Sequence, residues 1–454
     1  MVQVFPYLPW MVQHLIPDLH EKDIGYYSGL IASFQFVGRI LGSFVWGLLA
    51  DKFGRRIVLI ISGVLLAFVT LGFGFSTTVI VAIIFRFLIG FFNGIVPTAK
   101  AVISEYSDDS TQPFAMGFLG GVFSLGLVFS SGLSGILADP IMQYDIPKYE
   151  IFVKYPFVLP GAANAAILLI GVIIVYFFMK EPVKEQTNTH AINVAEDQVY
   201  SEGENETDEM LATPRTSKTR LGHQLVSIVR KSIFYHLITD WVVMLTIFIY
   251  SLFSVVTMSL DEVLPLWVKA PRDLGGLEMS IKDFSIVVAI SALITLPFSL
   301  FIFQILEKLF GGLRSFSVSI AILIPVCILI PSASALSAIP AVVYLGLFNL
   351  FMRLFISAVF ASLSMFINNS VTPDKLGAVN GLSLSICSIF RAMAPIYGGT
   401  VFAVSLNTHI FPFDYHFIFV LNGIALVLCI VFGMLIPESL NRKKIVKLDT
   451  LLDE

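Results

Sequence analysis

Apolar runs of about 20 residues recur along this chain and constrain its fold more than any other feature. A helix rises about 1.5 Å per residue, so each run is long enough to cross about 30 Å of hydrocarbon. The 454 residues are 56% hydrophobic and only 13% charged, whereas soluble domains carry roughly 25% charged residues. A soluble fold could not cover so much apolar surface, and the alternating strand patterns of a membrane barrel are absent from the sequence. The sequence therefore predicts an all-α membrane protein.

Twelve of these runs are predicted to be transmembrane helices, in two groups of six. Their bounds are 2–18, 24–50, 57–75, 78–104, 113–138, 156–179, 234–260, 283–306, 315–333, 337–368, 376–403 and 411–436. The first run is short and contains Pro6 and Pro9, so we expect it to be half-length or truncated.

The segment between the two groups is polar, rich in Glu, Thr and Asn, and without apolar periodicity. This composition predicts a disordered linker. The expected organisation is an N-terminal six-helix bundle (1–179), the linker (180–232), a C-terminal six-helix bundle (233–436) and a tail (437–454).

Lysine and arginine indicate the orientation of such a chain, because they are enriched in cytoplasmic loops. With the linker in the cytosol, the inside segments hold 17 of the 28 Lys and Arg residues and the outside loops hold six. We therefore expect the linker and the C-terminus to be cytosolic. The membrane is expected to be the plasma membrane or a vacuolar or endosomal membrane.

The second half of the sequence repeats the first. Arg86 and Arg353 lie at like places in FRFLIGFFNG and MRLFISAVFA, and Gly135 matches Gly399 at an offset of 264. The charged turn at 51–56 has a degenerate counterpart at 307–314. Two such halves predict a pseudo-symmetric bundle with a site between the halves, near the bilayer midplane, that is exposed to each side in turn.

The stretch GLLADKFGRR at 47–56 places four charges between two apolar runs. Through Leu59 it agrees at all nine specified positions with G-x-L-A-D-K-x-G-R-R-x-x-L, and it resembles the loop between helices 2 and 3 of the major facilitator superfamily. Its glycines allow close backbone approach, and its aspartate can lie against a helix N-terminus. The resemblance implies a cytosolic gate. We assign to it Gly47, Asp51, Lys52, Gly54, Arg55, Arg56 and Glu105.

Further stretches resemble the tetracycline-efflux-like and zinc-induced facilitator-like members of that superfamily. They include FPYLPWMV at 5–12, LDEVLPLW at 260–267 and RAMAPIYGG at 391–399. The likeness covers nearly the whole chain outside the linker, and Arg86-x-x-x-Gly90 is similar to the helix 4 motif of proton-coupled members. It implies export of small organic molecules against inward proton flow.

The sequence departs from the subgroup in the fifth span. The antiporter signature G-x-x-x-G-P-x-x-G-G begins at Gly126 here, but Ser131 replaces its proline. The eleventh span keeps the corresponding proline and two glycines. We expect these positions to pack helices: Gly126, Gly135, Pro395, Gly398 and Gly399. The linker region has only His190 and His223, so a zinc substrate is unsupported.

Charged side chains inside a bilayer are costly and mark functional candidates. Arg86 is too deep to reach the interface, so it contacts substrate, couples transport or forms a structural pair. For Arg391, substrate-anion contact and a structural pair are equally favoured. Asp261 and Glu262 are expected to end their helix, where they would bind a proton or cation, gate the outer mouth or simply be solvated. The expected coupling site or cavity comprises Gln35, Arg86, Gly90, Asn93, Tyr250, Asp261, Glu262, Asn349, Arg353 and Arg391.

No nucleotide-binding, nucleophile-elbow or zinc-protease motif occurs, so we expect no enzymatic activity, no cofactor and no bound metal. Cys327, Cys387 and Cys429 lie inside apolar runs and are expected to be small buried hydrophobes. The expected partners are a small-molecule substrate, protons and the lipid bilayer, with no nucleic acid, and the chain is expected to be a monomer. The alternatives are facilitative or proton-symport uptake of a small metabolite or organic anion, and a non-transporting truncated membrane protein.

Overall fold

The computed structural model describes residues 4–106, 126, 129–130, 132–144, 147–180, 237–372, 375–408 and 410–441. These residues form helices and connecting turns and contain no strand, which confirms the all-α prediction. Eight helices in this part of the chain are long and apolar enough to cross a membrane.

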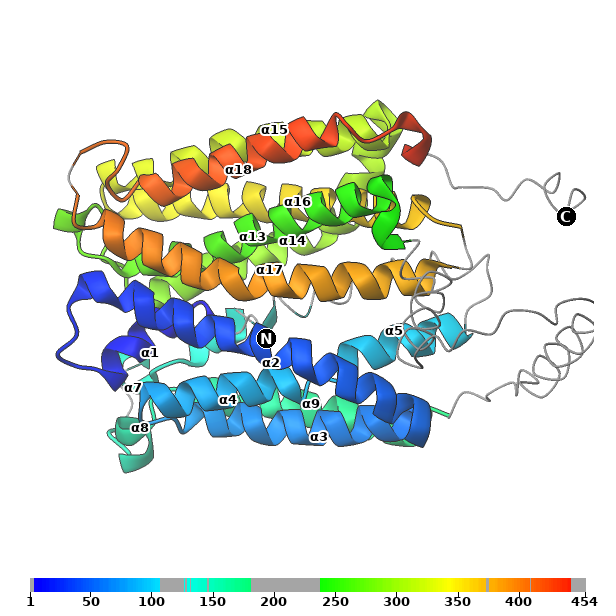
Figure 1. The fold of residues 1–454 in the computed structure, drawn as a ribbon. Helices are drawn as coiled ribbons and strands as arrows, with labels where there is room; N and C mark the ends of the chain where they lie inside the picture. The colour runs from blue at the N-terminus through cyan, green and yellow to red at the C-terminus, as the bar shows by residue number, and fades with distance from the viewer. Residues whose placement is uncertain are drawn as a thin grey trace, which may run out of the picture.

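The long helices lie side by side as a bundle, shown in Figure 1. The α-helices are α1 (Leu8–Leu15), α2 (Ile24–Phe53), α3 (Arg55–Gly74), α4 (Val79–Phe91), α5 (Ile95–Tyr106), α7 (Pro140–Tyr144), α8 (Glu150–Lys154), α9 (Val158–Phe178), α13 (Trp241–Lys269), α14 (Ile281–Phe310), α15 (Gly312–Leu329), α16 (Ala338–Asn369), α17 (Leu376–Ser405) and α18 (Phe417–Gly433). Short 3₁₀ helices cover Glu21–Asp23, Arg272–Leu274, Ile330–Ala335 and Glu438–Asn441.

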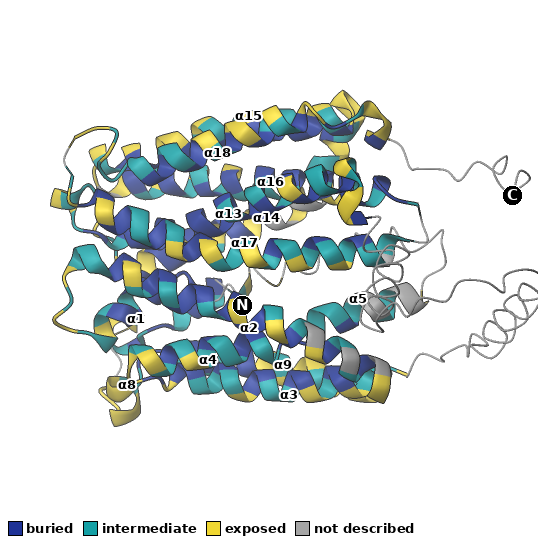
Figure 2. Cartoon of the chain, in the orientation of Figure 1, coloured by how far each residue is buried: buried dark blue, intermediate teal, exposed yellow. Residues whose placement is uncertain are grey.

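Many large apolar side chains of this bundle are exposed. Figure 2 marks exposed residues along the long helices in yellow. On α9, Ile170, Ile173 and Phe177 are more than half exposed, and on α14 Leu293 and Phe298 are as well. In water such a surface would drive aggregation. In a bilayer it faces lipid, so the exposure pattern agrees with the predicted membrane protein.

The helices pack in two groups that meet mainly at one pair. In the first group α2 packs on α4 and α3 packs on α9; in the second, α13 packs on α17 and α18, and α16 packs on α14 and α15. The pair that joins the groups is α2 with α17, which lie side by side at one end and diverge toward the other (Figure 1).

The predicted internal repeat is visible in two matching turns. Gly54 lies between α2 and α3 with φ 96° and ψ 156°, and Gly311 lies between α14 and α15 with φ 80° and ψ 163°. A side chain disfavours these backbone angles, so glycine is required at both turns. The turn at 51–56 and its degenerate counterpart therefore each contain a glycine with similar backbone angles.

Three predicted spans were wrong in detail, and the first is the N-terminal one. The helix predicted over 2–18 is only α1, Leu8–Leu15. Pro6 and Pro9 provide no backbone N–H, and Pro9 is tolerated because it lies in the first turn, where donors are unused. Short as it is, α1 is well packed, since Leu8, Met11 and Val12 are buried.

The helix predicted over 78–104 is interrupted, although Val79–Ala99 is still long and apolar enough to cross a membrane. It breaks after Phe91, and α5 begins at Ile95. The indole Nε1 of Trp46 on α2 donates a hydrogen bond to the carbonyl oxygen of Phe91 at 2.8 Å, which satisfies an acceptor at the end of α4. The same indole fills the space beside Gly94, where a side chain would overlap it.

The helix predicted over 234–260 begins later and runs further, as α13 from Trp241 to Lys269. Asp240 caps its N-terminus by accepting hydrogen bonds from the backbone N–H groups of Val242 and Val243. Most of the span predicted over 113–138, the linker over 181–232 and the tail beyond 441 lie outside the described residues. The other predicted spans agree with the helices to within six residues.

Candidate functional site

The two groups of helices touch through backbone at one end of α2 and α17. A Cβ atom on Gly25 would overlap the carbonyl oxygen of Gly399, and one on Gly29 would overlap that of Pro395. One or two turns further along, Phe36 of α2 forms a buried apolar cluster with Met258 and Ala394. This end of the interface is therefore closed, first by backbone contact and then by side chains.

An ion pair crosses the interface at the same end. Lys269, the last residue of α13, lies 2.7 Å from a carboxylate oxygen of Glu21, which is in the 3₁₀ helix before α2. The same ammonium group lies 3.5 Å from the side-chain oxygen of Gln13 at the end of α1. The pair links the two groups beside the glycine contacts.

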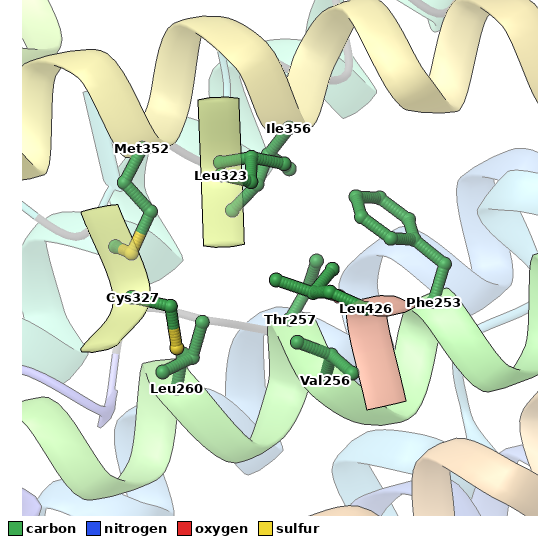
Figure 3. Close-up of a pocket in the computed structure, with 9 residues that line it drawn as sticks. All are labelled: Phe253, Val256, Thr257, Leu260, Leu323, Cys327, Met352, Ile356 and Leu426. Atoms are coloured by element: carbon green, nitrogen blue, oxygen red, sulfur yellow. The ribbon is translucent and has the colours of Figure 1, made fainter. Parts of the chain in front are cut away.

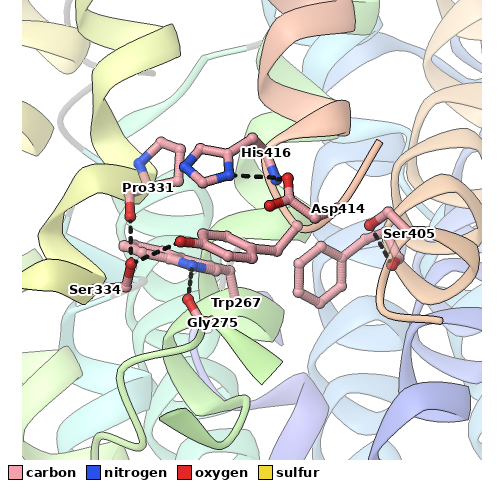
Figure 4. Close-up of polar contacts among 9 residues, drawn as sticks. Trp267, Gly275, Pro331, Ser334, Ser405, Asp414 and His416 are labelled. Atoms are coloured by element: carbon pink, nitrogen blue, oxygen red, sulfur yellow. Dashed lines mark hydrogen bonds and ion pairs between the residues drawn. The ribbon is translucent and has the colours of Figure 1, made fainter. Parts of the chain in front are cut away.

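Polar contacts around Trp267 hold the last turns of α13 in place (Figure 4). The indole of Trp267 donates to the carbonyl oxygen of Gly275 at 2.9 Å. Ser334 lies 3.0 Å from the hydroxyl of Tyr415, and His416 lies 2.9 Å from Asp414 in the loop before α18. The hydrogen bond of Trp267 ties the last turn of α13 to the loop that follows the helix.

Arg86 and Glu262 form a buried charged site between the two groups. Arg86 on α4 is 1% exposed, donates from Nε to the carbonyl oxygen of Ile31 at 3.4 Å and lies over the ring of Phe73. Its guanidinium interacts electrostatically with Glu262 of α13 and with Tyr7. Glu262 is also 1% exposed, and neither of its carboxylate oxygens has a hydrogen-bond partner among the described residues.

The placement of Asp261 and Glu262 corrects the sequence prediction. They do not end a helix and are not solvated, because α13 continues for seven residues beyond Glu262 and buries both. Asp261 instead forms an ion pair with Arg353 of α16 at 2.6 Å. That pair borders a small pocket that also touches Phe5 and Pro6 of the N-terminal segment.

Arg391 lies at the middle of α17, against α13. Its Nη2 lies 3.2 Å from the hydroxyl of Ser254 and 3.5 Å from that of Tyr250. The guanidinium also lies over the rings of Tyr250 and Phe360, at 5.8 and 5.9 Å from their centroids. Arg39 of α2, which is 8% exposed, interacts electrostatically with Arg391 across the interface.

Other predicted cavity residues are buried without joining one cluster. Gly90 packs α4 on α2, since a Cβ there would overlap the carbonyl oxygen of Gln35. The amide of Gln35 and the side-chain oxygen of Asn349 are buried without a hydrogen-bond partner among the described residues. Asn93 is 2% exposed and lies at the break between α4 and α5.

The structure places part of the predicted gate. Arg56 donates a hydrogen bond to the carbonyl oxygen of Tyr176 on α9 and lies over its ring at 5.6 Å. Lys52 is exposed and Arg55 is half-buried. The side chains of Asp51 and Glu105 lie outside what the structure describes.

The predicted packing residues differ in their surroundings. Gly135 faces Ser285 of α14, Gly398 faces Ser259 of α13, and Pro395 and Gly399 contact α2. Gly47 and Gly126 have open space where a Cβ would lie. Gly135, Pro395 and Gly399 thus lie where helices of the two groups meet.

An apolar cavity lies wholly inside the second group (Figure 3). It has room for about one water molecule, far less than a substrate pocket needs. Its lining is Phe253, Val256, Thr257, Leu260, Leu323, Cys327, Met352, Ile356 and Leu426. Cys327, Cys387 and Cys429 are all buried, as predicted.

Sequence reasoning missed two residues of the site, Tyr7 and Ser254. Tyr7 lies in the FPYLPW stretch, and its hydroxyl is buried near Arg86. Ser254 is one helical turn after Tyr250, so a hydroxyl at that spacing was the available signal.

Comparison with known proteins covers nearly the whole chain. The family model described as Major Facilitator Superfamily matches residues 3–395. Protein ZINC INDUCED FACILITATOR 1 of Arabidopsis thaliana is 28% identical over 93% of this chain and 86% of its own length. The major facilitator superfamily multidrug transporter mfsB of Aspergillus fumigatus is 25% identical over 90% of this chain and 76% of its own length.

A solved structure has the same fold. The partially occluded inward-open conformation of the xylose transporter XylE from E. coli superposes with a TM-score of 0.62, at 14% identity, covering 96% of this chain and 95% of that one. Together with the paired helix groups and the matching glycine turns, these comparisons show that the chain belongs to the major facilitator superfamily.

Proposed function

We propose that this protein is a proton-coupled exporter of small organic molecules. Family membership makes it a transporter of small molecules that works by alternating access. The observation that carries the finer proposal is the buried Glu262, which interacts electrostatically with Arg86 and has no hydrogen-bond partner among the described residues. A buried carboxylate in a membrane-spanning helix is a candidate proton carrier.

The position of this pair suggests how proton binding would be coupled to movement. Glu262 belongs to the second group of helices and Arg86 to the first. An ionised carboxylate attracts the guanidinium strongly in a medium of low dielectric constant. Protonation removes that attraction across the interface, so the two groups can rearrange when Glu262 gains or loses a proton.

Organic cargo is favoured over a metal ion. The printed name of the Aspergillus relative calls it a multidrug transporter. No cluster of three or more potential metal ligands occurs among the described residues. The charged site is bordered by aromatic and aliphatic side chains, such as Phe73 over which Arg86 lies, as suits an organic molecule.

The rest of the sequence-based assignment is proposed with it. The halves 1–179 and 233–436 would be the moving bundles, joined by a cytosolic linker at 180–232, in a monomer. The loop at 47–56 would close the cytosolic side, with Arg56 held against α9. The end closed by Gly25, Gly399 and the Lys269–Glu21 ion pair would then be the outer one.

Proton movement in proteoliposomes tests the proposal. The purified protein is challenged with a panel of amphiphilic drugs and organic anions, and internal pH is followed. Wild type is expected to show substrate-driven proton flux and Glu262→Gln to lose it, because the amide cannot carry a proton. Asp240→Asn is the matched control on the same helix, since asparagine also caps a helix N-terminus.

Each outcome has a distinct meaning. Proton flux retained in Glu262→Gln would show that this carboxylate is not the proton carrier. Substrate movement without proton movement in wild type would favour facilitated diffusion instead.

A further inference from the structure

We infer that the cargo carries an anionic group, a carboxylate or sulfonate on an aromatic or aliphatic body, and that Arg391 binds it beside Arg39, Tyr250 and Ser254. This inference names a substrate class for the proposed transporter and rests on its transporting a small organic molecule, but not on proton coupling.

The first argument is charge. Arg39 and Arg391 are like charges that interact across the α2–α17 interface, and a charged group inside a bilayer normally pairs with an opposite charge or with backbone carbonyl groups. Arg353, for example, pairs with Asp261, and Arg86 interacts with Glu262. The described residues give Arg391 hydroxyl and aromatic partners but no carboxylate. An anionic ligand would supply the missing charge.

The second argument is hydrogen bonding. A guanidinium only donates, so the hydroxyls of Ser254 and Tyr250 accept from Arg391. The Nε–H of Arg391 is buried and has no partner among the described residues. A carboxylate or sulfonate accepts several hydrogen bonds at once. It can therefore take the free Nε–H of Arg391 together with the hydroxyl proton of Tyr250.

The third argument concerns the apolar part of the ligand. The rings of Tyr250 and Phe360 lie on the guanidinium and contact each other with centroids 5.6 Å apart. Aromatic side chains beside a few polar groups are typical of small-molecule sites. This surface suits an apolar ligand with one charged end and does not suit a small hydrophilic anion.

The fourth argument is position along the interface. Arg39 lies one helical turn from Phe36 on α2, and Arg391 lies one turn from Ala394 on α17. Phe36 and Ala394 belong to the apolar cluster beneath the glycine contacts. Arg39 and Arg391 therefore lie inward of the closed end on the two helices that form it, where an exporter would hold its cargo before the closure opens.

Binding to matched probes tests the inference without a proton gradient. Naphthalene-2-carboxylate, naphthalene-2-sulfonate and the neutral naphthalene-2-carboxamide are titrated against the full chain in detergent, and affinity is measured calorimetrically and by thermal stabilisation. Wild type should prefer the two anions to the amide. Arg391→Gln should weaken anion binding by roughly tenfold or more, as expected for loss of a charged hydrogen bond, and leave amide binding unchanged.

Three further variants complete the experiment. Arg391→Lys keeps the charge and should bind the anions with intermediate affinity. Tyr250→Phe should weaken anion binding less than Arg391→Gln does. Lys148→Gln, a change at an exposed residue, should bind the anions as wild type does. Equal affinity of wild type for acid and amide, no binding of either anion, or full anion affinity in a folded Arg391→Gln would overturn the inference. If Arg391→Gln does not fold, the inference is tested by comparing the affinities of wild type and of Arg391→Lys for the acid and the amide. Proton flux is not measured in this experiment, so failure of the anion inference is distinguishable from failure of the proton-coupling proposal.

Discussion

Single residues at the turns of this fold are fixed by backbone geometry. Gly54 has φ 96° and ψ 156°, a region open almost only to glycine, where other residues store of order 1–3 kcal/mol of strain. Gly54→Ala should therefore lower stability by about that amount, and Gly311→Ala, at φ 80°, by a similar amount. Thermal melting in detergent measures both. Gly171→Ala is the control, because that helical glycine has open space around it; equal melting temperatures for all three variants would contradict the requirement for glycine.

For single residues, the burial of some charged side chains was predictable from the sequence, but their partners were not. The burial of Arg86 followed from its distance to the end of an apolar run, and the need for glycine in the 51–56 turn followed from the motif. The partners of Arg391 could not be predicted from the sequence. Tyr250 is 141 positions away in the chain, and only packing of α13 on α17 brings the two residues together. The ion pair of Asp261 with Arg353 was missed for the same reason.

At the scale of elements, the ion pair between Asp261 and Arg353 joins α13 to α16. Asp261 is 6% exposed, so removing its partner leaves a buried carboxylate without a counter-charge. Arg353→Met should therefore destabilise the protein by about 3–5 kcal/mol. Adding Asp261→Asn should recover most of that loss, because the neutral amide needs no ion pair. Chemical denaturation of the single and double variants measures the difference, and a double variant no more stable than Arg353→Met would show that the pair is not what joins these helices.

The ends of helices were predictable where an apolar run is followed by charged residues or proline. They were not predictable where tertiary contacts determine the end of the helix. Hydrophobicity alone continued the fourth span through 92–94, but Trp46 satisfies the end of α4 there and allows the break. Two acidic residues suggested the end of α13, yet the helix continues to Lys269, and Trp267 ties its last turn to the following loop. In both cases a hydrogen bond with another segment accompanies the departure from the local pattern.

At the scale of the whole molecule, closure of one end depends on two helices approaching without side chains between them. Gly29 of α2 faces the carbonyl oxygen of Pro395, and any side chain there must push α17 away. Gly29→Ala is thus expected to weaken this closure and raise the population open at that end, since a small energetic bias shifts a two-state equilibrium. The Lys269–Glu21 ion pair beside it is partly exposed and contributes about 0–1 kcal/mol, so it cannot restore the contact.

A reporter beneath the closure measures this shift. Phe36→Cys introduces a thiol at the apolar cluster inward of Gly29, and the three native cysteines are buried. A membrane-impermeant maleimide is added on the side where Glu21 and Lys269 lie. Labelling at position 36 should be slow in the Phe36→Cys parent and several-fold faster with Gly29→Ala, because the reagent reaches the thiol only when α2 and α17 separate. Gly346→Ala on α16, where an added Cβ makes one ordinary contact, should not change the rate. Equal labelling with and without Gly29→Ala would mean that the glycine contact does not control opening of this end.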